Sequence, residues 1–84
     1  MVFDYSKLLG RIKQKGFTQE TLAKHIGINP GVMSMKLNNL TPFKQKEMFA
    51  ICDALDIPIS EIGEYFFALK VRKSRTDDAA EKGA

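Results

Sequence analysis

Apolar residues recur at helical spacing in five short stretches of this 84-residue chain, and turn-forming residues separate the stretches. Capping residues stand at the start of several stretches, and glycine or proline follows their ends. The pattern predicts one all-α domain of five helices. The predicted helices cover about residues 5–15, 19–26, 30–38 and 45–55, and a last one from residue 61.

Residues 18–38 contain two of these helices with a tight turn between them. Thr18 is placed to cap the helix over residues 19–26, and Gly27 to end that helix in a left-handed conformation. Asn29 then caps the second helix, and Pro30 occupies its first turn. Two helices joined in this way form a helix-turn-helix unit, which in many small proteins presents its second helix to the major groove of DNA.

The other three helices supply the rest of the predicted core. Asp4 is predicted to cap the first helix, Gly16 to end it, and Ser60 to cap the last helix after Pro58. The apolar positions expected to face the core from these helices are Leu8, Leu9, Ile12, Met48, Ile51, Cys52, Leu55, Ile62, Tyr65 and Phe66.

The segment after the last helix permits two interpretations. Phe67, Leu69 and Val71 alternate with other residues as in a strand, and the same stretch also fits an extended helix. A strand would have no expected partner in a helical chain, so it would pair with a second copy. Beyond Lys73 the residues are small and charged, which predicts a domain over residues 1–73 and a disordered tail over 74–84.

Composition excludes several classes of function. The one cysteine, Cys52, permits no internal disulfide and no cysteine-based zinc site, and it indicates a reducing cytoplasm. No apolar run approaches the roughly 20 residues of a membrane span, and the amino terminus lacks a signal-peptide pattern. His25 has no catalytic partner in the sequence, and no glycine loop is suited to phosphates. We therefore expect no enzyme, cofactor, metal, membrane partner or small-molecule substrate.

Charge is distributed unevenly along the chain. Residues 1–40 hold six basic and two acidic side chains, whereas residues 41–67 hold two basic and five acidic ones. The basic part coincides with the helix-turn-helix unit, as phosphate binding would require, although ordinary solvated lysines would give the same pattern.

Several segments resemble a known family. Phe17-Thr18-Gln19-Glu20-Thr21-Leu22-Ala23 and Gly27-Ile28-Asn29 resemble the Cro and repressor-type helix-turn-helix regulators of temperate phages and bacteria. Val2-Phe3-Asp4-Tyr5-Ser6-Lys7-Leu8, Met35-Lys36-Leu37-Asn38-Asn39 and Glu61-Ile62-Gly63-Glu64-Tyr65-Phe66-Phe67 are similar to short phage Cro-like proteins. The resemblance implies a lambda-repressor-like fold. The family usually places an apolar core residue three positions after Met33, where this chain has Lys36 and reaches an apolar residue only at Leu37.

Helical geometry ranks the residues of the second helix of the unit by exposure. If Met33 and Leu37 define its buried side, the remaining positions point outward or lie on the flanks. Members of the resembled family read bases from the amino-terminal half of this helix. Polar side chains there suit base edges, and apolar ones suit thymine methyl groups. Met35 could instead pack against the core or a dimer partner, and Asn38 could cap the end of the helix. The predicted base contacts are Gly31, Val32, Ser34, Met35 and Asn38.

Phosphate contacts are predicted from charge and from helix ends. Gln19 and Asn29 stand at helix amino termini, where free amides favour an anion. Lys36 and Lys44 are the lysines expected nearest to DNA.

Two functions remain open. The first is a transcriptional regulator that binds operator half-sites on double-stranded DNA as a homodimer, because one short helix reads few base pairs. The second is a protein-binding module, such as a phage anti-repressor, which the modest net charge and the apolar Val32 and Met35 favour. The surface predicted for dimerisation comprises Phe66, Phe67, Leu69 and Val71.

Overall fold

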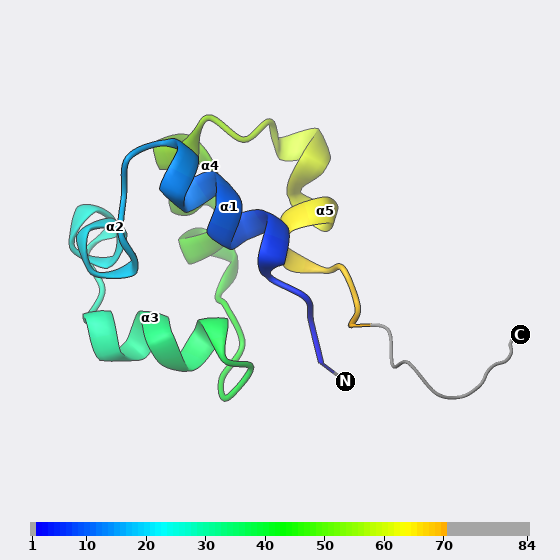
Figure 1. Cartoon of the computed structure of the whole chain (residues 1–84), viewed down its shortest axis with the longest axis horizontal. Coiled ribbons are helices and arrows are strands. Elements are labelled where there is room, and N and C mark those ends of the chain that lie inside the picture. The colour runs from blue at the N-terminus through cyan, green and yellow to red at the C-terminus, as the bar shows by residue number, and fades with distance from the viewer. Residues whose placement is uncertain (1, 71–84) are drawn as a thin grey trace, which may run out of the picture.

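The computed structural model describes residues 2–70, in which five α-helices enclose a single core (Figure 1). The predicted all-α fold of five helices is confirmed. The helices are α1 (Ser6–Gln14), α2 (Gln19–Ile26), α3 (Pro30–Leu37), α4 (Gln45–Leu55) and α5 (Ile62–Phe66), and a 3₁₀ turn, η1 (Ile59–Glu61), precedes α5. Within the described residues no helix is long and apolar enough to cross a membrane.

The helix-turn-helix unit forms from local signals. The Thr18 hydroxyl accepts a hydrogen bond from the Thr21 amide at 3.1 Å, and the Thr21 hydroxyl accepts one from the Thr18 amide at 2.8 Å. Gly27 ends α2 with a φ of 82°, a conformation that glycine adopts without strain. The Asn29 side chain then accepts from the Gly31 amide at 2.7 Å, which caps α3. The caps and the turn that the sequence predicts for this unit are all present.

The core includes most of the predicted apolar positions. Three aromatic rings contact one another in this core: the Phe43 ring meets the Tyr5 ring edge-on at 5.5 Å between centroids, and the Phe66 ring edge-on at 5.3 Å. The buried apolar residues are Tyr5, Leu8, Ile12, Leu22, Ala23, Met33, Leu37, Phe43, Ile51, Cys52, Leu55, Ile57, Tyr65 and Phe66.

One predicted core position is wrong. Leu9 is 39% exposed, because the buried stripe of α1 runs through Tyr5, Leu8 and Ile12 and leaves Leu9 beside it. Met48 and Ile62 are partly buried at the rim of the core rather than inside it.

Two helix starts also differ from the prediction. α1 begins at Ser6, with Tyr5 at its cap position, while the Asp4 carboxylate accepts a hydrogen bond from the Ser6 amide at 2.9 Å. Ser60 caps no helix, because it lies within the 3₁₀ turn that Pro58 opens. α5 consequently starts at Ile62, one residue later than predicted.

The segment after α5 pairs with the start of the same chain. Phe3 and Leu69 form an antiparallel bridge, and α5 ends at Phe66 rather than extending. The expectation that a strand here needs a second copy was wrong, because residues 2–4 supply a partner from the far end of the chain. Val71, the boundary at residue 73 and the tail 74–84 lie outside the described residues.

Asn39 holds the other side of the amino-terminal segment. Its side-chain oxygen accepts from the Phe3 amide at 2.9 Å, and its nitrogen donates to the Phe3 carbonyl at 3.0 Å. Asn39 also has a positive φ of 64°, which asparagine tolerates better than most residues. This residue therefore both shapes the turn directly after α3 and anchors residues 2–4.

Replacing Asn39 separates these two roles. Asn39→Gly removes both hydrogen bonds to Phe3 but keeps the positive φ, and we expect it to lower the free energy of unfolding by about 1–3 kcal/mol. Asn39→Ala also strains the backbone, by about 1 kcal/mol more, and should be the less stable variant. Urea denaturation measures both. An Asn39→Gly variant as stable as the parent would contradict the anchoring role.

Candidate interaction surface on α3

The helix α3 lies along one edge of the molecule, beside α2 (Figure 1). Met33 and Leu37 face the core, as predicted from helical geometry. The five predicted base-contact positions include four exposed residues and one half-buried residue, Ser34. Their role in base contact stays a prediction.

Lys36 is buried together with the apolar side of α3, with 5% of the residue exposed. Its ammonium group donates to the Pro42 carbonyl at 2.9 Å and lies 3.1 Å from a carboxylate oxygen of Glu47. This corrects the expectation that Lys36 faces a phosphate. The signal was present in the sequence, because Lys36 occupies the position where the resembled family has a core residue.

Glu47 connects this lysine to the start of α4. The same carboxylate accepts a hydrogen bond from the Lys44 amide at 2.8 Å, which satisfies one of the free amides of the helix end. The side chains of Lys36 and Glu47 are only 6% and 10% exposed. Burial alone would raise the pKa of Glu47, but the hydrogen bonds from Lys44 and Lys36 outweigh it and lower the pKa.

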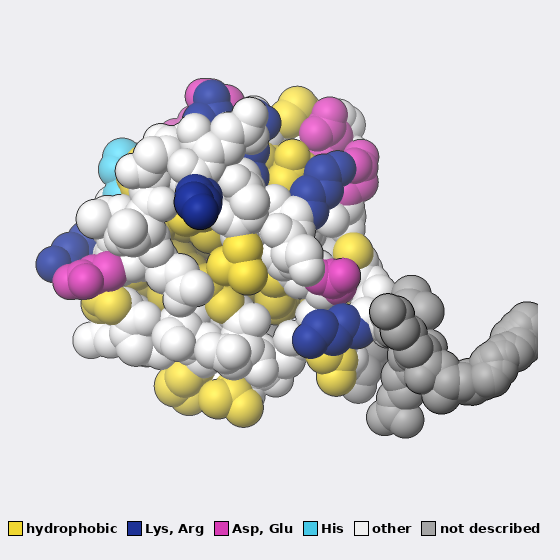
Figure 2. Space-filling model, viewed as in Figure 1, with side chains coloured by type: hydrophobic (Ala, Val, Ile, Leu, Met, Phe, Trp, Pro, Cys, Tyr) yellow, Lys and Arg dark blue, Asp and Glu magenta, His cyan; other side chains and the backbone are white. Residues whose placement is uncertain are grey.

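The outward face of α3 is largely apolar. Val32 and Met35 are 39% and 43% exposed, and Leu40 in the following loop is 70% exposed. The Leu40 amide donates to the Met35 carbonyl at 2.9 Å, which keeps the loop close to the helix end. Figure 2 shows hydrophobic side chains projecting from this edge of the molecule. We call Val32, Met35 and Leu40 the α3 patch.

Some polar side chains at the two ends of α3 already form hydrogen bonds with the backbone of the same helix. The Asn38 amide nitrogen donates to the Ser34 carbonyl at 2.8 Å, so Asn38 caps the end of α3, the alternative to base reading that the sequence left open. The Asn29 side chain is engaged in its cap at the other end. Neither contact prevents a further hydrogen bond to a ligand.

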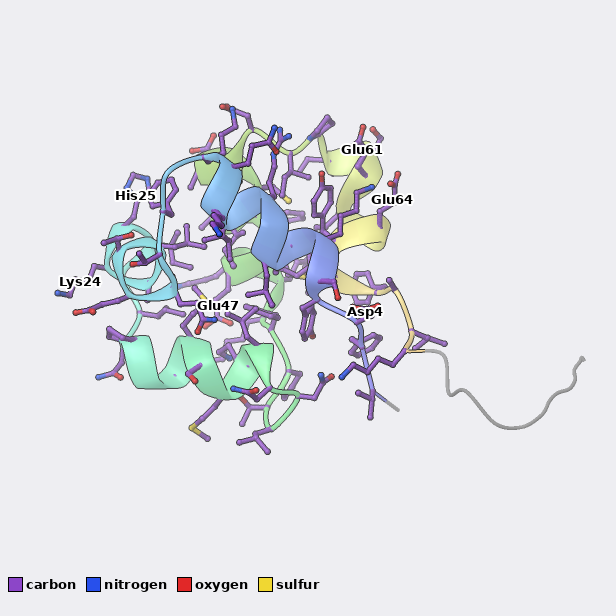
Figure 3. All side chains as sticks on the ribbon, in the orientation of Figure 1. Asp4, Lys24, His25, Glu47, Glu61 and Glu64 are labelled. Carbon is purple, nitrogen blue, oxygen red and sulfur yellow. The ribbon has the colours of Figure 1, made fainter. Side chains whose placement is uncertain are left out.

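Several basic side chains of residues 7–24 have acidic or carbonyl partners in the same chain. Lys24 lies 3.2 Å from Glu20 on α2, near the left edge of Figure 3. On α1, Lys7 pairs with Glu64 and Arg11 donates to the Leu55 and Asp56 carbonyls, and directly after the helix Lys15 pairs with Asp56. Exposed ion pairs of this kind are weak, yet each places a carboxylate beside a cation and reduces the local positive potential.

The remaining predicted phosphate contacts are exposed. Gln19 begins α2, and Lys44 stands at the cap position of α4. Both stay predictions, together with Asn29.

The predicted dimerisation residues separate into two groups. Phe66 is 2% exposed and belongs to the core, so its inclusion in a surface was wrong: it packs edge-on against Phe43. Phe67 and Leu69 are 50% and 53% exposed.

Side chains with potential chemistry lie apart from one another. Cys52 is buried in the core, and burial raises the pKa of its thiol. His25 is exposed on α2, with its ring 5.3 Å from that of Phe17. Among the described residues no three histidine, cysteine or acidic side chains gather as a metal site would require.

These features define a small all-helical protein with a helix-turn-helix unit whose second helix exposes an apolar surface. The chain belongs to the DUF739 family, described as a protein family of unknown function, whose model matches residues 1–69. It is similar to the solution structure of the modulator of repression (MOR) of the temperate bacteriophage TP901-1 from Lactococcus lactis. The two chains are 36% identical, with a TM-score of 0.71, over 86% of this chain and 97% of that one. No curated protein matches the chain. The resemblance to phage regulators is thus supported through a modulator of repression, and not through a Cro or repressor family.

The buried ion pair of Lys36 and Glu47 predicts how substitutions at these residues change the free energy of unfolding. Lys36→Met leaves the Glu47 carboxylate without its cation in a nearly buried position, and should lower the free energy of unfolding by about 3 kcal/mol. Adding Glu47→Gln removes the isolated charge and keeps an oxygen for the Lys44 amide, so the double variant should recover most of the loss. Chemical denaturation at neutral pH tests this. A double variant as unstable as the single one would mean that packing, and not charge pairing, is what Lys36 contributes.

The lowered pKa of Glu47 predicts a loss of stability in acid. Because the folded-state pKa lies below the unfolded value of 4.5, the carboxylate contributes stability that is present above that pH and is lost as the pH falls through the folded-state pKa. Unfolding free energies measured between about pH 7 and pH 3 should fall more steeply for the parent than for Lys36→Met/Glu47→Gln. Parallel pH curves would contradict this contribution.

Proposed function

We propose that this protein regulates repression in a temperate phage by binding a repressor protein through the α3 patch. The observation that carries the proposal is the character of α3: its outward face is apolar, and its one lysine is buried against Glu47. Similarity to a phage modulator of repression supports the regulatory part of the proposal. The proposed activity is binding without catalysis.

DNA and a protein partner require different surfaces on this helix. Most of the affinity for DNA comes from cations placed against phosphates, and the exposed side of α3 offers no lysine or arginine. A protein partner instead rewards burial of apolar side chains at the centre of an interface. Met35 suits such a role because its unbranched, polarisable side chain adapts to an irregular partner surface.

Direct binding to operator DNA as a dimer is the second candidate. It is favoured by the helix-turn-helix unit itself, with the amino termini of α2 and α3 exposed at Gln19 and Asn29 and with Ser34 accessible on α3. Lys44 would then supply a phosphate contact.

The proposal is tested on the operator complex of the helix-turn-helix repressor of the same phage. Adding this protein should change the repressor's affinity for a labelled operator duplex, and titration calorimetry should detect a complex between the two proteins. Met35→Asp buries a charge in the proposed interface and should weaken the complex by about tenfold or more. Ile59→Asp is the matched control: it adds the same charge at a 56% exposed residue of η1, outside the α3 patch. Equal effects of the two substitutions, or no complex at all, would overturn the proposal.

A selection from a random-sequence duplex library, at two salt concentrations, separates the two candidates. A repressor-binding protein should enrich no motif and bind only weakly. Enrichment of a palindromic motif, with strongly salt-dependent affinity, would favour direct operator binding. In that case Ser34→Ala should change the preferred sequence, while Lys44→Ala should weaken binding to all sequences alike.

A further inference from the structure

The antiparallel pairing at the chain ends leaves one backbone edge open. The Asp4 amide donates to the Ala68 carbonyl at 2.6 Å, and the Lys70 amide donates to the Val2 carbonyl at 2.9 Å. Phe3 and Leu69 therefore form the non-hydrogen-bonded pair of this ladder. In such a pair the N–H and C=O groups of both residues point away from each other. The Leu69 backbone is thus directed outward from the bridge.

The two outer edges of this small ribbon differ. On the side of Phe3, the side chain of Asn39 satisfies both outward backbone groups. On the side of Leu69, no hydrogen bond joins its N–H or C=O to another part of residues 2–70. Leu69 and its neighbour Phe67 are both about half exposed. The open edge therefore combines an unused donor and acceptor with exposed apolar side chains, which is the arrangement that accepts another strand.

We infer that this edge pairs with the same edge of a second copy of the chain, antiparallel and with Leu69 opposite Leu69 about a two-fold axis. The outward N–H and C=O of one Leu69 then bond to the C=O and N–H of the other, as in a hydrogen-bonded antiparallel pair. The result is a ribbon of four short segments, in the order 2–4, 68–70, 68–70 of the second copy and 2–4 of the second copy.

On one face of the ribbon, the charged side chains favour pairing with a second copy of the chain. Residues directly opposite each other in antiparallel segments place their side chains on the same face. Asp4 lies opposite Ala68, and the two-fold axis sets Ala68 opposite Lys70 of the second copy. Within one chain the hydrogen bonds that the Asp4 carboxylate accepts from Ser6 lower its pKa, and the charge of Lys70 adds to this effect. Lys70 of the second copy could extend over the small alanine and add a second positive charge near the same carboxylate. The two-fold axis produces this pairing of opposite charges twice.

The other face of the ribbon favours the same partner. Phe3 and Leu69 share that face, so pairing would create a continuous apolar row of Phe3, Leu69 and their two equivalents. The Phe67 ring already contacts Phe3 edge-on, at 5.9 Å between centroids. A single bridge between two short segments is marginal in water, whereas four segments with a hydrophobic face form a more stable unit. The segment is thus complementary to itself in hydrogen bonds, charge and apolar surface.

Disulfide crosslinking tests the register. With Cys52→Ala as the background, Leu69→Cys should give a crosslinked dimer under mild oxidation, because opposite residues of a hydrogen-bonded pair are about 5.5 Å apart between Cα atoms. Lys70→Cys is the matched control. In this register the two residues 70 are diagonal neighbours, beyond the roughly 7 Å that a disulfide spans, and should crosslink poorly. Faster crosslinking at residue 70 than at residue 69 would overturn the proposed register.

Sedimentation of the full chain tests the association itself. The parent should dimerise at micromolar concentrations, and Leu69→Asp, which sets two like charges opposite each other, should raise the dimer dissociation constant by about tenfold or more. Leu9→Asp makes the same change at an exposed leucine of α1 and should leave the constant unchanged. Circular dichroism checks that each variant is folded. A parent that stays monomeric, or a Leu69→Asp variant that dimerises like the parent, would overturn the inference.

Both readouts are independent of repressor binding. Loss of the dimer with the repressor complex retained would refute this inference alone, and the reverse result would refute the proposed function alone.

Discussion

The contact between Lys36 and Glu47 sets how α3 is presented. Lys36 belongs to the last turn of α3 and Glu47 to the first turn of α4, and the loop between them supplies a third partner in the Pro42 carbonyl. With Lys36 directed inward, the rotation of α3 about its axis places Val32 and Met35 outward. The same contact removes a positive charge from the surface. The buried ion pair thus acts together with Met33 and Leu37 on the core side of α3, and it leaves the exposed side of this helix without a lysine.

A second constraint joins the two ends of the chain. Residues 2–4 lie between Asn39 on one side and residues 68–70 on the other, so the start of the chain, the loop after α3 and the segment after α5 are held together. Phe3 also packs near Tyr5 and Phe67, next to the aromatic rings of the core. These contacts have large separations in sequence. They form only once the helices have packed and brought the three segments close.

These two constraints determine where the exposed apolar residues lie. The α3 patch lies on the side of the chain away from the buried Met33, Lys36 and Leu37, and the open edge at Leu69 lies opposite the edge of the ribbon that Asn39 occupies. Two surfaces of different kinds result, one made of side chains on a helix and one made of backbone groups in the bridged segment 68–70. A small regulatory protein could thus contact one partner through α3 and a second copy through its chain end, without one contact using the residues of the other.

The helices and the helix-turn-helix unit were predictable from sequence because their signals are local. Thr18, Gly27, Asn29 and Pro30 act on residues within a few positions of themselves, and the apolar spacing of α4 identified its bounds, Gln45–Leu55, directly. The core position of Phe66 was also predicted from helical spacing, although its inclusion in a surface was wrong. The partners of Lys36 and Leu69 were decided by tertiary structure: Lys36 pairs with Glu47 on the next helix, and Leu69 pairs with Phe3 from the other end of the chain. The buried lysine and the bridged segment each need a partner outside their own element. Helical periodicity describes one helix at a time, so it does not identify such a partner.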